Sequence, residues 1–215
     1  LGCCILGDQA AFVTQTRCKR LASVYGTEIN FRRDITTESQ CIQTISSDVK
    51  GACVYEEEFT KTCKITTQKE CSDLELQKES VEFHAGFLCS AEELGTVCGP
   101  SEKTTTCVEG KDEVYFVDSC GNIANIYNSQ RVKDPLYWRE ILDKSESCNP
   151  ESSNADSSTC GHCDYFLGST CKAFQRGEDK VRPNLGDNIC RDLSCEYQGD
   201  KIRHGESFCA QETES

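Results

Sequence analysis

The sequence lacks methionine altogether, and among its 215 residues it has one tryptophan, four prolines and three histidines. The missing methionine, absent even from position 1, leads us to expect a chain that was processed or cut from a longer one. No apolar run approaches the roughly 20 residues that a membrane-spanning helix needs, so we expect no direct membrane span in this segment. No glycine-rich phosphate loop and no Asn-x-Ser/Thr glycosylation acceptor occur.

Positive charge is scarce as well, since 23 lysines and arginines stand against 36 aspartates and glutamates and the net charge is -13. Binding to nucleic acid requires cations that release counterions from the phosphates, so we expect no nucleic-acid partner. The densest acidic run, residues 56–58, is expected to be a solvated strand face, with a calcium site as the alternative.

Cysteine is what the chain has in abundance. Its 18 cysteines are an even number, typical of a disulfide framework formed in an oxidising compartment. Only 37% of the residues are hydrophobic and the mean hydropathy is -0.54, so one large core is not expected. Each native disulfide contributes about 2–4 kcal/mol in a small secreted unit. We therefore predict a small disulfide-rich fold, dominated by β-hairpins with short α-helices and built from tandem modules.

All 18 cysteines are expected to form disulfides: Cys3, Cys4, Cys18, Cys41, Cys53, Cys63, Cys71, Cys89, Cys98, Cys107, Cys120, Cys148, Cys160, Cys163, Cys171, Cys190, Cys195 and Cys209. We do not expect Cys3 and Cys4 to bond to each other, because adjacent Cα atoms lie about 3.8 Å apart and disulfides usually span about 4.4–6.8 Å. On an extended segment they point to opposite faces, so we expect them to bond to two different neighbours.

A weak internal repeat marks the N-terminal half. Residues 35–41 align with residues 65–71, and residues 13–18 form a third copy. In the two clearer copies a threonine stands three residues before Gln or Glu, which is the spacing of a capping box. Each copy should therefore end a strand and open a short helix. The cysteine that ends the copy then falls in the first helical turn, where it can staple that turn to the preceding hairpin.

Helix signals are few. We predict a long helix over residues 8–25, a short one opened by Ser90 with Glu93, and one that begins at Asp134-Pro135. Leu136, Ile141 and Leu142 are expected to form the apolar stripe of the last helix. Strands are predicted at 52–59 and 60–66 as a pair, at 104–108, 114–119 and 123–127 as a three-stranded meander, and as hairpins over 163–174 and 195–209.

These signals suggest four regions. Residues 1–100 should form repeated hairpin and short-helix modules, and 101–147 the meander with a short helix. Residues 148–159, rich in Asn, Pro, Ser, Asp and Glu, read as a linker, and 160–215 as a C-terminal hairpin module. The aromatic residues Tyr115, Phe116, Tyr127, Tyr137 and Trp138 are expected to form the core of the meander, with a binding patch as the alternative.

One segment resembles a catalytic motif. Cys160-Gly161-His162-Cys163 has the four residues of the redox centre of protein disulfide isomerases, but no apolar strand precedes it and no amphipathic helix follows. We expect structural bridges there. The alternatives are thiol–disulfide exchange, or a zinc site completed by two of Cys171, Cys190, Cys195 and His204. His84, expected to be packed between Phe83 and Phe87, His162 and His204 lie in no recognisable hydrolytic triad, and we expect no cofactor.

The segments LGCC (1–4), FVTQTRC (12–18), CGNIANIY (120–127) and CDYFLGS (163–169) resemble cysteine-rich proteins predicted in the genomes of small symbiotic archaea. That resemblance covers most of the chain and implies an exported surface protein, without an assigned activity. CEYQG (195–199) and RHGESF (203–208) are similar to von Willebrand factor type C modules, whose disulfide-rich hairpins serve as protein-binding and spacer units.

From these observations we expect a non-enzymatic extracellular or cell-surface structural protein, a component of a fibre, sheath, stalk or adhesin. Its partners should be proteins, either copies of itself or other surface proteins. The alternative is a secreted binding module such as a protease inhibitor, in which a rigid loop between cysteines is preorganised for a partner. A thiol–disulfide oxidoreductase that uses Cys160 and Cys163 is the third hypothesis.

Overall fold

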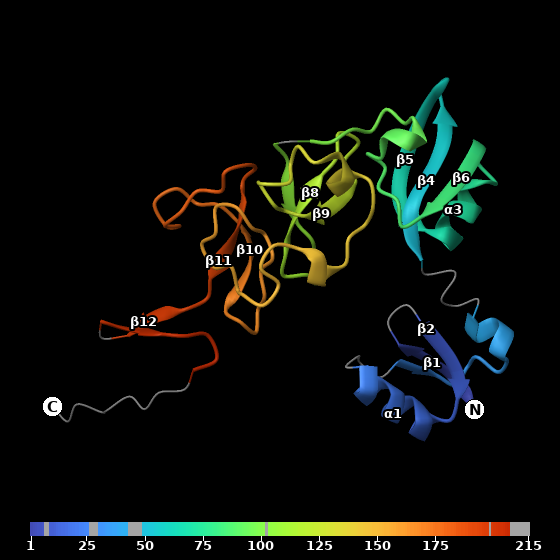
Figure 1. The fold of residues 1–215 in the computed structure, drawn as a ribbon, viewed down its shortest axis with the longest axis horizontal. Coiled ribbons are helices and arrows are strands. Elements are labelled where there is room, and N and C mark those ends of the chain that lie inside the picture. Colours follow the sequence, from blue (N-terminus) through green and yellow to red (C-terminus); the bar gives the residue numbers. More distant parts are fainter. Residues whose placement is uncertain (7–8, 26–29, 43–48, 102, 198, 207–215) are drawn as a thin grey trace. The chain divides into compact units, whose positions relative to one another are not determined.

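The computed structural model describes residues 1–6, 9–25, 30–42, 49–101, 103–197 and 199–206. The chain divides into two compact units, Leu1–Cys89 and Ser90–Ser215, which are described separately here. Figure 1 shows short elements joined by long loops. The strands form five small antiparallel sheets of two or three strands, accompanied by short helices and eight disulfides, so the predicted disulfide-rich, β-hairpin-dominated fold is confirmed.

The first sheet has the strand order β2-β1-β3, with β1 (Gly2–Leu6) between β2 (Gln9–Val13) and β3 (Asn30–Arg32). Helix α1 (Gln15–Tyr25) follows β2 directly. The long helix predicted over residues 8–25 is therefore wrong at its start. Residues 9–13 pair with β1 over their whole length, and this pairing overrides the helical spacing of the apolar residues.

Cys3 and Cys4 point to opposite sides of β1, as expected for neighbours on a strand. Cys3 bonds to Cys41 and packs with Ile35, whereas Cys4 bonds to Cys18 on α1. Both are 0% exposed, so each disulfide is the centre of a small core on its own face of the sheet. The prediction that they reach two different partners is confirmed.

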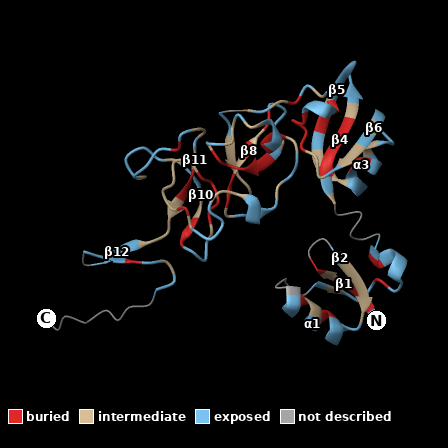
Figure 2. Cartoon of the chain, in the orientation of Figure 1, coloured by how far each residue is buried: buried red, intermediate tan, exposed pale blue. Residues whose placement is uncertain are grey.

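The second sheet has the order β5-β4-β6, built from β4 (Lys50–Glu57), β5 (Thr60–Thr67) and β6 (Glu79–Ala85), with α3 (Gln68–Leu74) between β5 and β6. The predicted strand pair is confirmed, with Glu57 opposite Thr60 and Lys50 opposite Thr67. Figure 2 shows buried residues along much of β4, the central strand. Two disulfides fasten this sheet, Cys53–Cys71 and Cys63–Cys89.

The sequence repeat corresponds to a repeated piece of structure. In each copy the threonine hydroxyl accepts a hydrogen bond at 3.3 Å from the backbone N–H three residues later, at Thr14, Thr37 and Thr67. Such a side-chain acceptor satisfies one of the N–H groups of the first turn that have no partner within the helix. The cysteine four residues after each threonine then bonds back to a strand: Cys18 to Cys4, Cys41 to Cys3 and Cys71 to Cys53.

The second unit begins with the predicted meander, in the order β7-β8-β9: β7 (Thr105–Cys107), β8 (Val114–Val117) and β9 (Ile123–Ile126). Its core is aromatic. Phe116 is 0% exposed, and its ring meets those of Tyr127, Tyr137 and Trp138 at centroid distances of 5.2, 6.5 and 5.1 Å. Tyr115 is half-buried. Four of the five aromatic residues therefore form the core of the meander as expected, whereas Tyr115, the neighbour of Phe116 on β8, lies outside it.

Two helix predictions in this unit need correction. Ser90 does not cap the short helix η1 (Glu92–Leu94), because its hydroxyl donates instead to the Trp138 carbonyl at 2.8 Å. Helix η2 (Pro135–Trp138) begins as predicted, with Asp134 as its N-cap, but it is a single 3₁₀ turn. It buries Tyr137 and Trp138, while Leu136 is 64% exposed, so the expected apolar stripe is wrong.

The C-terminal part contains two further hairpins. Strand β10 (Ser169–Ala173) pairs with β11 (Asn188–Asp192), so the hairpin predicted within residues 163–174 is wrong. Strands β12 (Cys195–Tyr197) and β13 (Asp200–Ile202) pair across Gly199, as predicted for the last hairpin. Gly199 has a φ of 91°, a left-handed value that favours glycine. The end of the predicted hairpin, up to Cys209, lies outside the described residues.

Residues 148–159, for which the sequence predicts a linker, make hydrogen bonds to several elements of the second unit. Asp156 N–H donates to the Cys190 carbonyl, and the Ser158 carbonyl accepts from the Tyr127 hydroxyl, both at 2.8 Å. A short 3₁₀ turn, η3 (Lys144–Glu146), precedes this segment. Within the described residues, every helix falls short of the length and apolar character needed to cross a bilayer.

Candidate functional site

The Cys160-Gly161-His162-Cys163 segment lies against the meander. Gly161 donates its N–H to the Tyr127 carbonyl and accepts from the Val114 N–H, both at 2.8 Å. A Cβ added at Gly161 would lie 2.8 Å from atoms of Val114 and Tyr127. This close approach explains the glycine, because any side chain would force the segment away from the sheet.

The two cysteines of this segment bond to different partners. Cys160 pairs with Cys148 and Cys163 pairs with Cys190, and their exposures are 2% and 0%. A Cys-x-x-Cys redox centre instead alternates between a dithiol and one disulfide within the motif, through an accessible thiolate. The observed pairing therefore fits the expected structural bridges.

His162 is the buried ionisable group of this region, with 2% of its surface exposed. Its Nδ1 is hydrogen-bonded to the Ser147 hydroxyl, and that hydroxyl also donates to the Lys144 carbonyl at 2.7 Å. A serine hydroxyl has one proton, so with that proton directed to Lys144 the imidazole carries its own proton on Nδ1. The other ring nitrogen, Nε2, then holds a lone pair without a hydrogen-bond partner in the described structure.

The surroundings of His162 favour its neutral form. Burial lowers the pKa of His162 below 6.5, and the Lys144 ammonium lowers it further, against the opposing effect of Glu113 and Asp164. Glu113 is itself buried, forms an ion pair with Lys144 and accepts from the Tyr115 hydroxyl at 3.0 Å. Although burial raises the pKa of Glu113, the hydrogen bonds from Lys144 and Tyr115 outweigh it and hold that pKa below 4.5.

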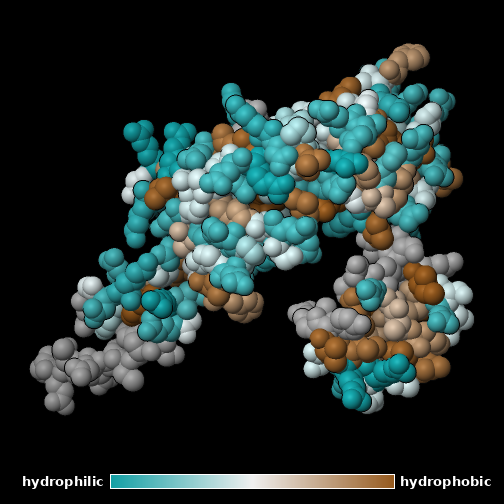
Figure 3. All heavy atoms as spheres, viewed as in Figure 1, coloured by the Kyte–Doolittle hydropathy of each residue, from teal (hydrophilic) through white to brown (hydrophobic). Residues whose placement is uncertain are grey.

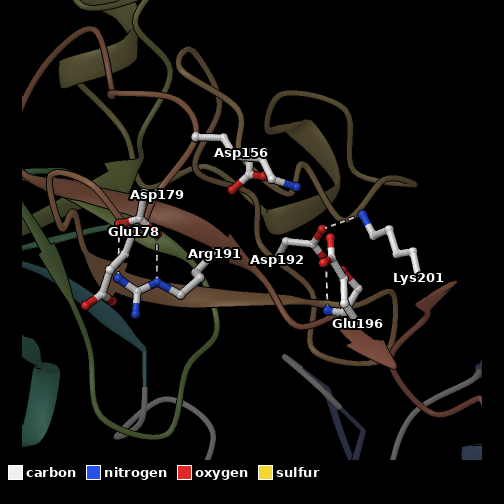
Figure 4. Close-up of a pocket in the computed structure, with 9 residues that line it drawn as sticks. Asp156, Glu178, Asp179, Arg191, Asp192, Glu196 and Lys201 are labelled. Atoms are coloured by element: carbon white, nitrogen blue, oxygen red, sulfur yellow. Dashed lines mark hydrogen bonds and ion pairs between the residues drawn. The ribbon is translucent and has the colours of Figure 1, made fainter. Parts of the chain in front are cut away.

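A separate pocket of about 340 Å3 lies beside β11 and the β12–β13 hairpin (Figure 4). Its lining is polar and mostly charged: Asp156, Glu178, Asp179, Lys180, Arg191, Asp192, Ser194, Glu196 and Lys201. The five carboxylates and three cations leave it acidic. Such a lining suits a polar or cationic group rather than an apolar ligand.

Two ion pairs are built into this pocket. Arg191 donates to both carboxylate oxygens of Asp179, at 2.9 and 3.0 Å, and the Asp179 side chain is only 4% exposed. Lys201 donates to Asp192 at 2.7 Å. Figure 4 shows these two pairs on either side of the pocket.

The carboxylates of both pairs are held in their charged form. Burial raises the pKa of Asp192, but the hydrogen bonds from Lys201 and from Ser194 outweigh it and bring the pKa to about 2. Burial likewise raises the pKa of Asp179, and the hydrogen bonds from Arg191 and the Gln175 N–H outweigh it, so the pKa falls below 3.8. These two pairs neutralise four of the eight charged groups, and the acidic character of the pocket comes from the others, Asp156, Glu178 and Glu196 against Lys180.

Sixteen of the cysteines form disulfides: Cys3–Cys41, Cys4–Cys18, Cys53–Cys71, Cys63–Cys89, Cys98–Cys120, Cys107–Cys171, Cys148–Cys160 and Cys163–Cys190. Cys195, on β12, is exposed and has no disulfide partner among the described residues. Cys209, for which a disulfide is also predicted, lies outside them. At these sixteen positions the sequence predicted that the cysteine forms a disulfide, but it did not predict which cysteine is its partner.

The alternative zinc set is dispersed. Cys160, Cys163, Cys171 and Cys190 are all committed to disulfides, and the His204 ring lies 4.4 Å from that of Tyr165. In the part of the chain that the structure describes, no group of three or more His, Cys, Asp or Glu side chains is arranged to hold a metal ion. The acidic run at 56–58 lies at the end of the β4–β5 hairpin, with Glu57 ion-paired to Lys78.

His84 forms part of β6, and its ring meets Phe87 edge-on at a centroid distance of 6.2 Å. Its side chain stays 34% exposed, with Nε2 3.5 Å from the Glu82 carboxylate, so the expected packing is only partial. Sequence reasoning missed the Asp179–Arg191 and Asp192–Lys201 pairs, because ordinary charged residues at irregular spacing carry no local signal. It also missed the buried Glu113, whose only sequence cue is a place directly before a hydrophobic strand.

Comparison of this chain with protein-family models, with curated proteins and with solved structures finds no match in any of the three. The resemblances to archaeal surface proteins and to von Willebrand factor type C modules therefore remain predictions. The features that bear on function are the disulfides, the exposed surface, the surroundings of His162 and the charged pocket beside β11.

Proposed function

We propose that this chain is a non-enzymatic extracellular structural protein, a component of a cell-surface assembly such as a fibre, sheath, stalk or adhesin. The observation that carries the proposal is the placement of the disulfides. Four of the eight lie within Leu1–Cys89 and four within Ser90–Ser215, so each unit is cross-linked internally.

Local cross-linking supports a spacer or load-bearing role. Each disulfide in a small secreted unit stabilises by about 2–4 kcal/mol, mainly by restricting the unfolded chain. Three of the bridges repeat one device, a Thr-capped helical turn bonded to a strand. Modules that hold their own shape can be placed in series and can survive outside the cell, where neither chaperones nor reductants maintain them.

The small sheets also leave strand edges for contacts between subunits. In the second sheet only β4 has a neighbour on both sides, so β5 and β6 each present one edge, and β12 and β13 form a two-stranded ribbon. Edge strands pair readily with other chains through their unpaired N–H and C=O groups. These edges support an assembly of copies or of related surface proteins.

Sedimentation velocity and electron microscopy of the purified, oxidised protein test this proposal. We expect concentration-dependent oligomers and ordered polymers, and we expect reduction and alkylation to abolish them. A protein that stays monomeric at millimolar concentration and forms no fibres or layers would contradict the structural role.

A specific loop favours a second candidate, a secreted protein-binding module such as a protease inhibitor. Tyr165, Phe166 and Leu167 are consecutive and exposed, at 47%, 90% and 52%. Three exposed apolar residues in a row are unfavourable unless they serve binding. Bridges at Cys163 and Cys171 hold the two ends of the loop.

The loop is also fixed internally. Tyr165 N–H donates to Asp112 and Leu167 N–H donates to Asp164, both at 3.1 Å. A preorganised loop loses little entropy on binding, which favours an anchoring role. Inhibition assays against serine proteases that cleave after aromatic residues or leucine test this candidate, with Phe166→Ser as the control variant. The absence of inhibition by the native protein would exclude this class of partner.

A further inference from the structure

Phe59 is the most exposed large apolar side chain of the described structure, with a relative exposure of 107%. It lies in the turn between β4 and β5, where Figure 3 shows an apolar projection at the place that Figure 1 gives to this turn. Nothing in the described part of the chain packs on it. The ring gains no burial in the folded monomer, so its apolar surface is available for a contact with another chain.

The turn does not need these side chains. Glu57 is paired with Thr60, so Glu58 and Phe59 form a two-residue turn, with φ values of 49° and 63°. Such turns favour Asn-Gly, because most L-residues are strained at positive φ. Glycine and asparagine would close this hairpin with less strain. The side chains of Glu58 and Phe59 therefore do not serve the turn itself.

The end of the sheet that carries this turn is acidic. The end of the hairpin carries Glu56, Glu57 and Glu58, with Glu79 opposite Glu56 on β6, all exposed. Two lysines oppose them, Lys61 on β5 and Lys78, which is ion-paired to Glu57. Four negative and two positive charges leave this end of the sheet with a net charge of -2. We call Glu56, Glu58 and Phe59 the hairpin tip.

Helix α1 offers the complementary chemistry. It contains Arg17, Lys19 and Arg20 and no acidic residue, although the chain as a whole has a net charge of -13. Arg17, Arg20 and Val24 are three and four residues apart, so they lie along one exposed stripe, and Val24 is 74% exposed. The three cationic side chains have no ion-pair partner among the described residues.

We propose that the hairpin tip of one copy of this chain binds the exposed stripe of α1 on a second copy. The Phe59 ring would lie against Val24 and the methylene stems of the arginines, with a guanidinium over its face. The Glu56 and Glu58 carboxylates would pair with Arg17 and Arg20, whose planar groups suit both carboxylates and aromatic rings. This inference rests on the proposed structural role and assigns the contact that would join the subunits.

The contact has a direction. The tip and the helix are different surfaces, so the interface is heterologous and each copy keeps one unused tip and one unused helix. Repetition of such a contact extends a chain of subunits, unless the rotation between copies closes a ring. A small contact with exposed charges should be weak and salt-dependent, so assembly would require a high local concentration, as at a cell surface.

Sedimentation velocity across a range of concentrations gives the first measurement. Phe59→Ser and, separately, Arg17→Glu with Arg20→Glu should each weaken self-association at least tenfold. Raising NaCl from about 0.1 M to about 1 M shortens the screening length from about 10 Å to about 3 Å and should weaken native self-association in the same direction. Leu136→Ser is the control, because it removes an apolar side chain that is 64% exposed and belongs to neither proposed contact, and it should leave self-association unchanged.

A mixing experiment tests the direction of the contact. The tip variant retains an intact helix and the helix variant retains an intact tip. We expect each alone to be monomeric and an equimolar mixture to form a one-to-one dimer that does not extend. Exchanging the charges, with the Glu56→Lys, Glu58→Lys variant mixed with the Arg17→Glu, Arg20→Glu variant, should restore a complementary contact in both directions, so this mixture should extend beyond the dimer although each variant alone stays monomeric.

A third variant separates loss of binding from loss of folding. Glu58→Asn with Phe59→Gly should relieve the strain of the turn and raise the melting temperature, while it abolishes self-association. If the native protein assembles and the tip variants assemble equally well, this inference is wrong and the structural role stands on another contact. If the native protein does not assemble at all, both are wrong.

Discussion

The imidazole of His162 is held by the Ser147 hydroxyl through Nδ1, while its Nε2 has no partner among the described residues. A proton added to Nε2 would place a positive charge in a buried position near the Lys144 ammonium. The ring is therefore stable in its neutral form, and the fold around the Cys160 and Cys163 bridges depends on that form.

We predict an acid-sensitive contribution to stability from His162. Its pKa is lowered in the folded protein, whereas an unfolded histidine titrates near 6.5. Between these two pKa values the unfolded chain binds more protons than the folded protein. The contribution of His162 to the free energy of unfolding is therefore fully present above about pH 6.5 and is lost as the pH decreases below it. Urea unfolding at several pH values from 8 to 5 measures this slope.

His162→Leu should flatten that part of the profile, since it removes the titrating group and keeps the site apolar. Equal slopes for the native protein and His162→Leu would mean that another group is responsible for the acid sensitivity.

Thr67 caps α3 through a complete capping box, with Glu70 N–H donating to its hydroxyl and the Glu70 carboxylate accepting from its N–H. Thr67→Ala should lower the free energy of unfolding by about 1 kcal/mol, because one N–H of the first turn loses its acceptor. Thr67→Ser keeps that acceptor and should be close to neutral. In the α1 copy the third helical residue is Arg17, which cannot return the bond, but Thr14→Ala removes the same single acceptor and should cost a similar amount. A larger loss at Thr14 would contradict this account of the repeat.

The sequence predicted most where the structural cause is local. Threonine caps, the β4–β5 hairpin and the opposite directions of Cys3 and Cys4 follow from interactions within a few residues, so a short pattern suffices to indicate them. The start of α1 failed because pairing with β1 overrode the helical pattern of residues 9–13.

Contacts between distant segments could not be predicted in the same way. The pairing of β10 with β11 and the Cys107–Cys171 bridge, whose cysteines are 64 positions apart, depend on how loops return to the sheet. Any of the remaining cysteines was an equally good partner at the level of sequence. The Asp179–Arg191 pair gave no signal either, because exposed and buried charges look alike in a sequence.

We predict that Gly161 is required because there is no room for a side chain at this position, and not because of its backbone conformation. Gly161→Ala would bring a Cβ to 2.8 Å from atoms of Val114 and Tyr127, so the segment has to move away from the meander. We expect a loss of about 1–3 kcal/mol, as for other overpacked sites. Gly99→Ala is the control, since a Cβ there meets nothing within 4 Å. Thermal unfolding of the two variants side by side makes the comparison, and equal melting temperatures would contradict it.

The Asp179–Arg191 pair should matter more than an exposed pair. Arg191→Met leaves the Asp179 carboxylate, which is 4% exposed, without its two-pronged donor, and we expect a loss of about 1–3 kcal/mol. Asp34→Asn, in a pair whose side chains are 49% and 63% exposed, should have no measurable effect. Urea unfolding at pH 7 measures the free energy of unfolding of both variants. Equal losses in the two variants would show that the Asp179–Arg191 pair stabilises the fold no more than an exposed pair does.

The cysteine chemistry gives the last prediction. Brief alkylation of the native protein should modify Cys195, because it is exposed and lies outside the eight bridges. Peptide mapping without reduction should recover Cys148 linked to Cys160 and Cys163 linked to Cys190. With that pairing, insulin-reduction activity should be absent and Cys160→Ser should lower stability rather than activity. Recovery of a Cys160–Cys163 disulfide together with insulin reduction would instead establish thiol–disulfide exchange. If Cys195 resists alkylation and is recovered linked to Cys209, the disulfide framework extends to the last hairpin.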